Sequence, residues 1–225
     1  MLTDEEKKEI QEKRKGYSID FSKINNPFNA YFIGLMLTDG YISDENKFGI
    51  DLTDEDVIAF ISKTTGQNYN IYTSNNENKK DRYRIIFSDK EQVNILSRYG
   101  LVKNKTFTLS GFDILEEEEP YLPYLIRGII DGDGCIYTTS YEKPAFFIIT
   151  ASKEFADWIA KILSHRFYMK DIHPHKTSNG AWRIDTALEY NIKILNDIIY
   201  NQPYGMERKY KKLRETFNDY NKGIQ

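Results

Sequence analysis

The chain has 225 residues and a mass of 26.5 kDa, with 40% hydrophobic and 29% charged residues, a composition that excludes a disordered or fibrous protein. It shows no apolar run long enough to cross a membrane, no secretory signal, and a single cysteine, Cys135, so we expect a soluble intracellular globular protein without internal disulfides. The net charge of −3 argues against a uniformly basic surface, although five of the acidic residues lie together in residues 113–119.

Hydrophobic periodicity predicts a helix, hairpin, helix, hairpin, helix order in the first half of the chain. Residues 1–26 form a charged extension with a short helix capped by Thr3, and an apolar helix follows. Gly100 is well placed to end the last helix of this half. The remaining predicted elements are strand Phe48–Leu52, a helix from Asp54 to Ile61, strands Asn70–Ser74 and Arg82–Phe87 around a turn at Asn75–Asn78, and a helix from Lys90 to Tyr99.

The second half repeats this order after an acidic linker. The four glutamates at 116–119 are most simply solvated in that linker. The predicted elements are strand Ala145–Thr150, a helix from Lys153 to Phe167, strands Ile172–Lys176 and Trp182–Thr186 around a turn at Ser178–Gly180, and a helix from Tyr190 to Tyr200. The organisation is therefore an N-terminal extension (1–26), a first half (27–100), a linker (101–120) and a second half with a C-terminal helix (121–225).

A duplicated motif supports this division. Residues 31–42 read YFIGLMLTDGYI and residues 125–136 read LIRGIIDGDGCI. Aligned on their Asp-Gly pairs, the two segments match Gly34 with Gly128 and Asp39 with Asp133. Both are apolar around most of their circumference, which is typical of a buried helix. The chain is therefore a tandem repeat of one α/β unit.

Small residues four apart give each motif helix a face that allows close backbone approach. These residues are Gly34 and Thr38 in the first motif and Gly128 and Gly132 in the second. We expect the two helices to pack against each other across a pseudo-twofold axis. Asp39 and Asp133 then lie at the same end of the pair, where the helix dipoles disfavour negative charge. Two acids in that position need a cation, and divalent ions that prefer oxygen ligands are suited to it.

The two motifs and their downstream elements resemble the single-chain, two-motif form of the LAGLIDADG homing endonucleases. The resemblance implies an α+β fold in which two antiparallel sheets form a DNA-binding saddle around the central motif helices. It also implies that Asp39 and Asp133 hold Mg²⁺, with the backbone carbonyls of Thr38 and Gly132 joining the coordination. Two positions depart from the family pattern: Leu37 replaces an acid that the second motif keeps as Asp131, and Arg127 replaces a small residue.

This resemblance implies a monomeric, site-specific DNA endonuclease. Divalent metals can activate water, stabilise the phosphate and neutralise the leaving oxygen. Scissile phosphates that face each other across a minor groove about 6 Å wide would give a staggered double-strand break with 3′ overhangs. Lys105 and Lys209 follow the third helix of each half, where the family often has a supporting lysine. They are either catalytic or solvated surface residues, with Lys103 and Arg208 as substitutes if the register slips.

Strand alternation indicates which side chains would face double-stranded DNA. Tyr83, Ile85 and Phe87 form an apolar side of their strand, and the residues between them point outward. A zinc site at the histidines is not expected, because no cysteine accompanies them. The predicted DNA-facing residues are Ser43, Glu45, Lys47, Arg82, Arg84, Tyr137, Thr139, Tyr141, His173, His175, Arg183 and Asp185.

Two alternatives share the same fold. One is a group I intron maturase, which would bind intron RNA, and the other is a DNA-binding protein that does not cleave. The presence of both acids favours the nuclease, because a protein that only binds has no chemical need for them. The composition, rich in Asn, Lys, Ile and Tyr, indicates an AT-rich genome, as in a bacterium, a phage or an organelle.

Overall fold

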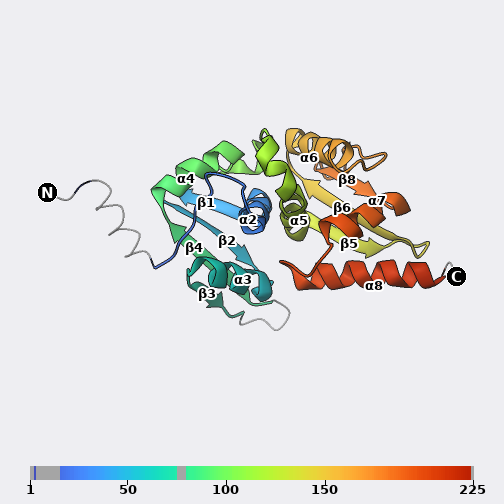
Figure 1. Cartoon of the computed structure of the whole chain (residues 1–225), viewed down its shortest axis with the longest axis horizontal. Coiled ribbons are helices and arrows are strands. Elements are labelled where there is room, and N and C mark those ends of the chain that lie inside the picture. Colours follow the sequence, from blue (N-terminus) through green and yellow to red (C-terminus); the bar gives the residue numbers. More distant parts are fainter. Residues whose placement is uncertain (1–2, 4–15, 75–79, 224–225) are drawn as a thin grey trace.

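The computed structural model describes residue 3, residues 16–74 and residues 80–223 (Figure 1). The helix expected near the N-terminus and the turn at 75–78 lie outside these residues. In the described part of the chain, no helix combines the length and the apolar character needed to cross a bilayer.

The first half begins with helix α2 and follows the predicted order. Asn26 caps α2, since its side-chain oxygen accepts a hydrogen bond from the Asn29 amide at 2.9 Å, and Pro27 occupies the first turn. Gly100 ends the half with a φ of +76°. The elements are α2 (Pro27–Thr38), β1 (Gly40–Asp44), β2 (Lys47–Leu52), α3 (Glu55–Thr65), β3 (Tyr69–Tyr72), β4 (Arg82–Ser88) and α4 (Lys90–Leu96), followed by a 3₁₀ turn (Ser97–Tyr99).

The second half repeats these elements and adds a C-terminal helix. Ser152 caps α6 by accepting a hydrogen bond from the Phe155 amide at 3.2 Å. The elements are α5 (Leu122–Asp133), β5 (Gly134–Thr138), β6 (Pro144–Thr150), α6 (Lys153–His165), β7 (His175–Lys176), β8 (Trp182–Thr186), α7 (Glu189–Ile194), a π-helical segment (Leu195–Ile199) and α8 (Glu207–Gly223).

Two four-stranded antiparallel sheets lie on either side of the central pair α2 and α5 (Figure 1). Their strand orders correspond, β1-β2-β4-β3 in the first half and β5-β6-β8-β7 in the second. The apolar face of the first sheet carries Ile42, Phe48 and Phe87, which lie opposite one another across β1, β2 and β4. Helices α3 and α6 pack on their respective sheets. The opposite faces carry the polar side chains that strand alternation assigns to them.

Three local features differ from the sequence-based expectation. Strand β7 has two residues instead of five, because Pro174 has no amide to donate to the neighbouring strand. The last helix of the second half changes to π-helical geometry at Leu195. The linker contains two 3₁₀ turns, Lys105–Phe107 and Glu116–Tyr121.

The expectation that all four linker glutamates are solvated is wrong for Glu118. Its side chain is 3% exposed and accepts hydrogen bonds from the amides of Leu115 at 3.1 Å and Ile24 at 3.4 Å. A buried carboxylate is stable only when donors surround it. Glu118 therefore fastens the residues before α2 to the residues before α5.

Candidate active site between the two halves

The central helices are in backbone contact at their glycines. A Cβ added to Gly34 would collide with the carbonyl oxygen of Leu125 and lie 3.0 Å from the Gly128 Cα. A Cβ added to Gly128 would collide with the carbonyl oxygen of Tyr31. Because no side chain fits between them, α2 and α5 approach as the spacing of small residues predicts.

The same close approach continues to the ends of both helices. A Cβ on Gly132 would collide with Thr38 Oγ1 and lie 2.8 Å from Oδ2 of Asp39. The Asp39 carboxylate of α2 therefore lies directly beside the last turn of α5, which ends at Asp133. The structure thus brings residues of the two motifs together across the middle of the molecule.

The ionisation of both acids is shifted in the folded protein. Burial raises the pKa of Asp39 above its usual value. Burial, and after it the negative charge of Asp39, raise the pKa of Asp133 to about 6. Both groups lie at helix C-termini, which are themselves negative. The helix ends therefore hold two partly buried carboxylates whose ionised form is disfavoured mainly by burial.

Two buried lysines bind the same helix ends. Lys105 is 8% exposed, and its Nζ donates hydrogen bonds to the carbonyls of Thr38 at 3.0 Å and Gly40 at 2.8 Å. Lys209 is 5% exposed, and its Nζ donates to the corresponding carbonyls of Gly132 at 3.2 Å and Gly134 at 2.7 Å. The lysines therefore occupy equivalent places in the two halves, and neither is a solvated surface residue.

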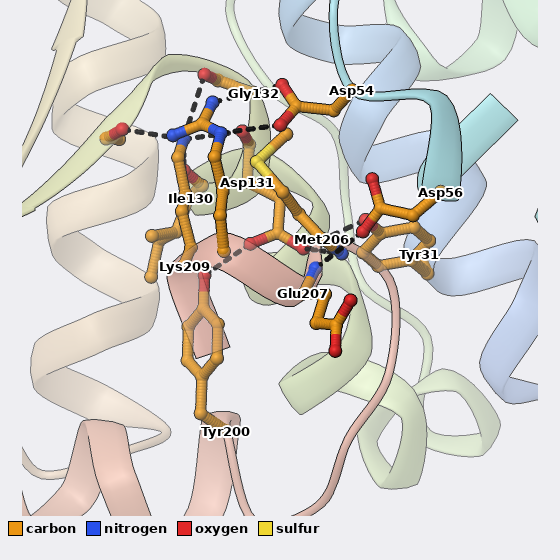
Figure 2. A network of polar contacts seen from close by, with 12 residues as sticks. Tyr31, Asp54, Asp56, Ile130, Asp131, Gly132, Tyr200, Met206, Glu207 and Lys209 are labelled. Atoms are coloured by element: carbon orange, nitrogen blue, oxygen red, sulfur yellow. Dashed lines mark hydrogen bonds and ion pairs between the residues drawn. The ribbon is translucent and has the colours of Figure 1, made fainter. Parts of the chain in front are cut away.

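Lys209 is held more extensively than Lys105. Its Nζ also donates to the carbonyls of Ile130 at 2.8 Å and Asp131 at 2.5 Å (Figure 2). The two substitutes considered from the sequence lie elsewhere: Lys103 is exposed, and Arg208 pairs with Asp54.

The electrostatic coupling of acids and lysines crosses between the halves. Burial lowers the pKa of both lysines. Among the charges that oppose this at Lys105, Asp133 acts more strongly than Asp39. Conversely, Lys209 lowers the pKa of Asp39 more than Lys105 does. Of the two lysines, each acid therefore interacts more strongly with that of the other half, so the four groups are electrostatically coupled across the halves.

The donor atoms at the helix ends are suited to a divalent cation. The described residues contain no cluster of three or more His, Cys, Asp or Glu side chains that could bind a metal. The two carboxylates are instead accompanied by the carbonyl oxygens of Thr38 and Gly132, each of which has a second lone pair besides the one directed at a lysine. Oxygen ligands of this kind, two carboxylates and two backbone carbonyls, fit Mg²⁺.

Sequence reasoning missed a buried polar network centred on Asp131. This carboxylate accepts hydrogen bonds from Tyr31 Oη at 2.8 Å, Tyr200 Oη at 2.5 Å and the Met206 amide at 3.0 Å (Figure 2). Burial and the charge of Asp131 raise the pKa of both tyrosines, so both phenols keep the proton that they donate. The only signal in the sequence was a charged pair, Arg127 and Asp131, four apart in an otherwise apolar helix.

Arg127 lies beside that network and is 1% exposed. Its Nε is 3.9 Å from Asp131 Oδ2, its guanidinium lies 4.4 Å from the centroid of the Tyr200 ring, and its Nη1 donates to the carbonyl of Gln202 at 2.7 Å. Arg127 is thus a buried cation that compensates the charge of Asp131.

The outer face of the first sheet brings together the predicted arginines. Arg82 and Arg84 both donate through Nε to Asp51, at 3.0 and 2.8 Å, and Arg84 also stacks over the Tyr72 ring. Ser43 and Lys47 are exposed on the strands beside them. Asp51 was not predicted, although its place opposite Arg84 follows from the strand register.

Only some of the DNA-facing residues predicted in the second half lie on strands of the second sheet. Arg183 lies over the Phe147 ring at 4.0 Å and donates to Tyr137 Oη at 3.4 Å. His175 Nδ1 is 3.5 Å from Asp185. The remaining predicted residues lie outside the strands: Thr139 and Tyr141, which is 85% exposed, are in the turn after β5, and His173 precedes β7.

No protein-family model matches this sequence, and no curated protein matches it. Solved structures are similar over most of the chain. The meganuclease I-SmaMI bound to uncleavable DNA is 13% identical, with a TM-score of 0.56 over 88% of this chain and 91% of that chain. I-GzeII, a LAGLIDADG homing endonuclease in complex with its DNA target, is 15% identical, with a TM-score of 0.51 over 85% and 88%.

The likeness also includes a protein that is not described as an endonuclease. The N-terminal LAGLIDADG domain of DUF199/WhiA is 13% identical, with a TM-score of 0.54 over 85% of this chain and 87% of that domain. Each of the three matches covers at least 85% of this chain, so each includes parts of both halves. The chain therefore has the LAGLIDADG fold that its duplicated motif predicts.

Proposed function

We propose that this protein is a Mg²⁺-dependent endonuclease that cuts both strands of a specific DNA duplex. The observation that carries the proposal is the meeting of two partly buried carboxylates, Asp39 and Asp133, beside two buried lysines at the glycine-packed helix ends. The likeness to DNA-bound endonucleases supports it, whereas the likeness to the WhiA domain means that the fold alone does not separate cleavage from binding. Burying two like charges destabilises the folded state, and catalysis accounts for such an arrangement.

In this proposal Asp39 and Asp133, with the carbonyls of Thr38 and Gly132, would hold the metal. Bound Mg²⁺ would supply an activated water, charge stabilisation at the phosphate and neutralisation of the leaving oxygen. The chain's own residues bind and orient the substrate. Lys105 and Lys209 fix the carbonyls of the helix ends and place a positive charge next to each acid, where a phosphate could be bound.

The arrangement of the halves suggests the product. Two equivalent sites side by side would cut opposite strands across the minor groove, whose width is about 6 Å, leaving 3′ overhangs. A single chain supplies both sites, so we expect a monomer. Side chains on the two outer sheet faces, Arg82, Arg84, Arg183 and Lys47 among them, would contact bases and phosphates of an asymmetric target.

A selection experiment tests this proposal. Duplexes with a randomised segment are selected for binding in EDTA, and the bound pool is then incubated with Mg²⁺. We expect the wild type to give shortened duplexes with 3′ overhangs. We expect Asp39→Asn and Asp133→Asn to bind the duplex within about threefold of the wild type and to leave it uncut. These substitutions remove negative charges near the phosphates but keep the basic contacts. Calorimetric titration should show that the double variant loses Mg²⁺ binding. A wild type that binds its selected duplex and leaves it intact in Mg²⁺ would instead establish the non-cleaving DNA-binding alternative.

A further inference from the structure

The start of helix α8 is held by acids from both halves of the chain. The Glu207 amide donates to Asp56 Oδ2 at 2.8 Å, and the Met206 amide donates to Asp131 Oδ2 at 3.0 Å (Figure 2). Asp131 belongs to α5 of the second half, and Asp56 lies in the first turn of α3 in the first half. Because the first amides of a helix have no partner within the helix and carry positive charge, carboxylates at this place stabilise and orient it.

A charged pair reinforces the contact with the first half. Arg208 donates through Nε and Nη2 to the two carboxylate oxygens of Asp54, at 2.5 and 3.1 Å. The Asp54 side chain is 11% exposed, and it makes no capping hydrogen bond within its own helix α3. Its carboxylate is therefore directed at α8, and a two-point pair of this kind fixes orientation as well as distance.

Lys209 follows these two contacts directly. It lies in the first turn of α8, and its Nζ reaches the carbonyls at the end of α5, among them those of Gly132 and Gly134. The acids hold residues 207 and 208, so a shift or rotation of this turn would move Nζ away from the helix end. The first half of the chain thus determines where the ammonium of the second half lies.

Lys105 has no comparable support. It starts a 3₁₀ turn that follows Asn104, whose φ is +61°, and no side chain caps that turn. The two lysines contact equivalent carbonyls, but only Lys209 depends on acids from the opposite half. This asymmetry cannot follow from the repeat itself, because it involves α8, which has no counterpart after the first half.

We propose that Asp54 and Asp56 of the first half are positioning residues for Lys209 in the second half. The inference rests on the proposed function, since it assigns Lys209 to the cleavage of one DNA strand. It follows that the halves are not independent: loss of the two acids impairs the cut served by Lys209 and leaves the cut served by Lys105 intact.

Single-turnover cleavage with each strand labelled separately tests this. We expect Lys209→Met to slow the cleavage of one strand and Lys105→Met to slow the cleavage of the other. The variant Asp54→Ala/Asp56→Ala should slow the Lys209 strand by about tenfold or more, because an ångström-scale misplacement can cost that much, and leave the other strand within about twofold. Asp56→Asn keeps an acceptor for the Glu207 amide, so it should retain most of the cleavage rate that Asp56→Ala loses. Glu55→Ala is the matched control, since Glu55 lies in the same turn but bonds to Tyr69.

If the wild type cleaves DNA and the double variant cuts both strands at equally reduced rates, or both at the wild-type rate, Asp54 and Asp56 have no positioning role. A second measurement does not depend on cleavage. The ζ-ammonium protons of Lys209, buried and bonded to carbonyls, should give slowly exchanging NMR signals that disappear in Asp54→Ala/Asp56→Ala and persist in Glu55→Ala. The signals of Lys105 should persist in both. Retention of the Lys209 signals in the double variant would overturn the inference whatever the protein does to DNA, whereas their loss in a protein without nuclease activity would uphold the contact and refute only the proposed function.

Discussion

Two aspartates on helix α5, two residues apart, are held in opposite ways. Asp131 is surrounded by three hydrogen-bond donors and faces the Arg127 guanidinium. Asp133 is only partly buried and faces another acid: burial, and after it the negative charge of Asp39, raise its pKa. The first carboxylate therefore serves the fold, and the second destabilises it.

Asp133→Asn should stabilise the protein in the absence of metal. The pKa of Asp133 is raised to about 6 in the folded state, so the folded protein keeps this proton at a pH where the unfolded chain has released it. Stability from this group therefore falls as pH rises from about 4 to 6 and stays lower above that range. In urea denaturation at pH 7 with EDTA, we expect the substitution to raise the free energy of unfolding by about 1–3 kcal/mol. A less stable variant at pH 7 would contradict this assignment.

Asp131→Asn should have the opposite effect. An amide cannot accept all three hydrogen bonds, and Arg127 would be left as an uncompensated buried charge, a change that typically costs about 3–5 kcal/mol. The same urea titration measures it. Asp185→Asn is the control, because Asp185 is partly exposed and pairs with Arg183 near the surface, where such pairs contribute about 0–1 kcal/mol. Equal effects at 131 and 185 would contradict a structural role for the network.

At the scale of elements, the packing of α2 against α5 determines whether a site exists. Gly34→Ala would place a methyl group on the Leu125 carbonyl oxygen, and the helices would have to separate. We expect a loss of about 1–3 kcal/mol in the free energy of unfolding, as overpacking usually gives, together with loss of cleavage, because Asp39 and Asp133 move apart.

Gly180→Ala separates this effect from a general cost of replacing glycine. Gly180 has a φ of +90° and open space around its Cα, so alanine there is strained but meets no neighbour. We expect a loss of about 1 kcal/mol or less and unchanged cleavage. A Gly34→Ala variant that cleaves at the wild-type rate would show that close backbone contact is not needed for the site.

How far the sequence predicts such features depends on whether their partners are local. The glycine spacing of each motif and the alternation of β4 are local patterns, so the helix pair and the outward direction of Arg82 and Arg84 could be predicted. The partners of Asp131 could not, since Tyr31 and Tyr200 lie far from it along the chain and only the tertiary fold brings them together. For the same reason the burial of Glu118 was missed: its hydrogen-bonded partner Ile24 precedes the first motif.

At the scale of the whole molecule, the negative net charge must be reconciled with the proposed binding of DNA. The chain carries 31 basic and 34 acidic residues, and the linker acids, concentrated at 113–119, lie before α5 rather than on the sheets. Several acids also pair internally with basic residues, as Asp54 does with Arg208. In the proposed complex, the charge that DNA would meet is therefore that of the outer sheet faces and the central site, and not the sum over the chain.

This distribution of charge predicts which lysines make the affinity for DNA depend on salt concentration. Each phosphate contact contributes a slope of about −0.9 to a plot of log affinity against log salt concentration. Lys47 is exposed at the start of β2, on the outer face, and Lys47→Ala should make the slope shallower by about 1 with the selected duplex. Lys153, on α6, pairs with Asp157 at 2.6 Å, and α6 packs on the other face of its sheet, so Lys153→Ala removes the same charge and should leave the slope unchanged. Equal slopes for the two variants would mean that DNA does not lie along the outer face of the first sheet, because a contacted lysine cannot be removed without retaining a counterion at its phosphate.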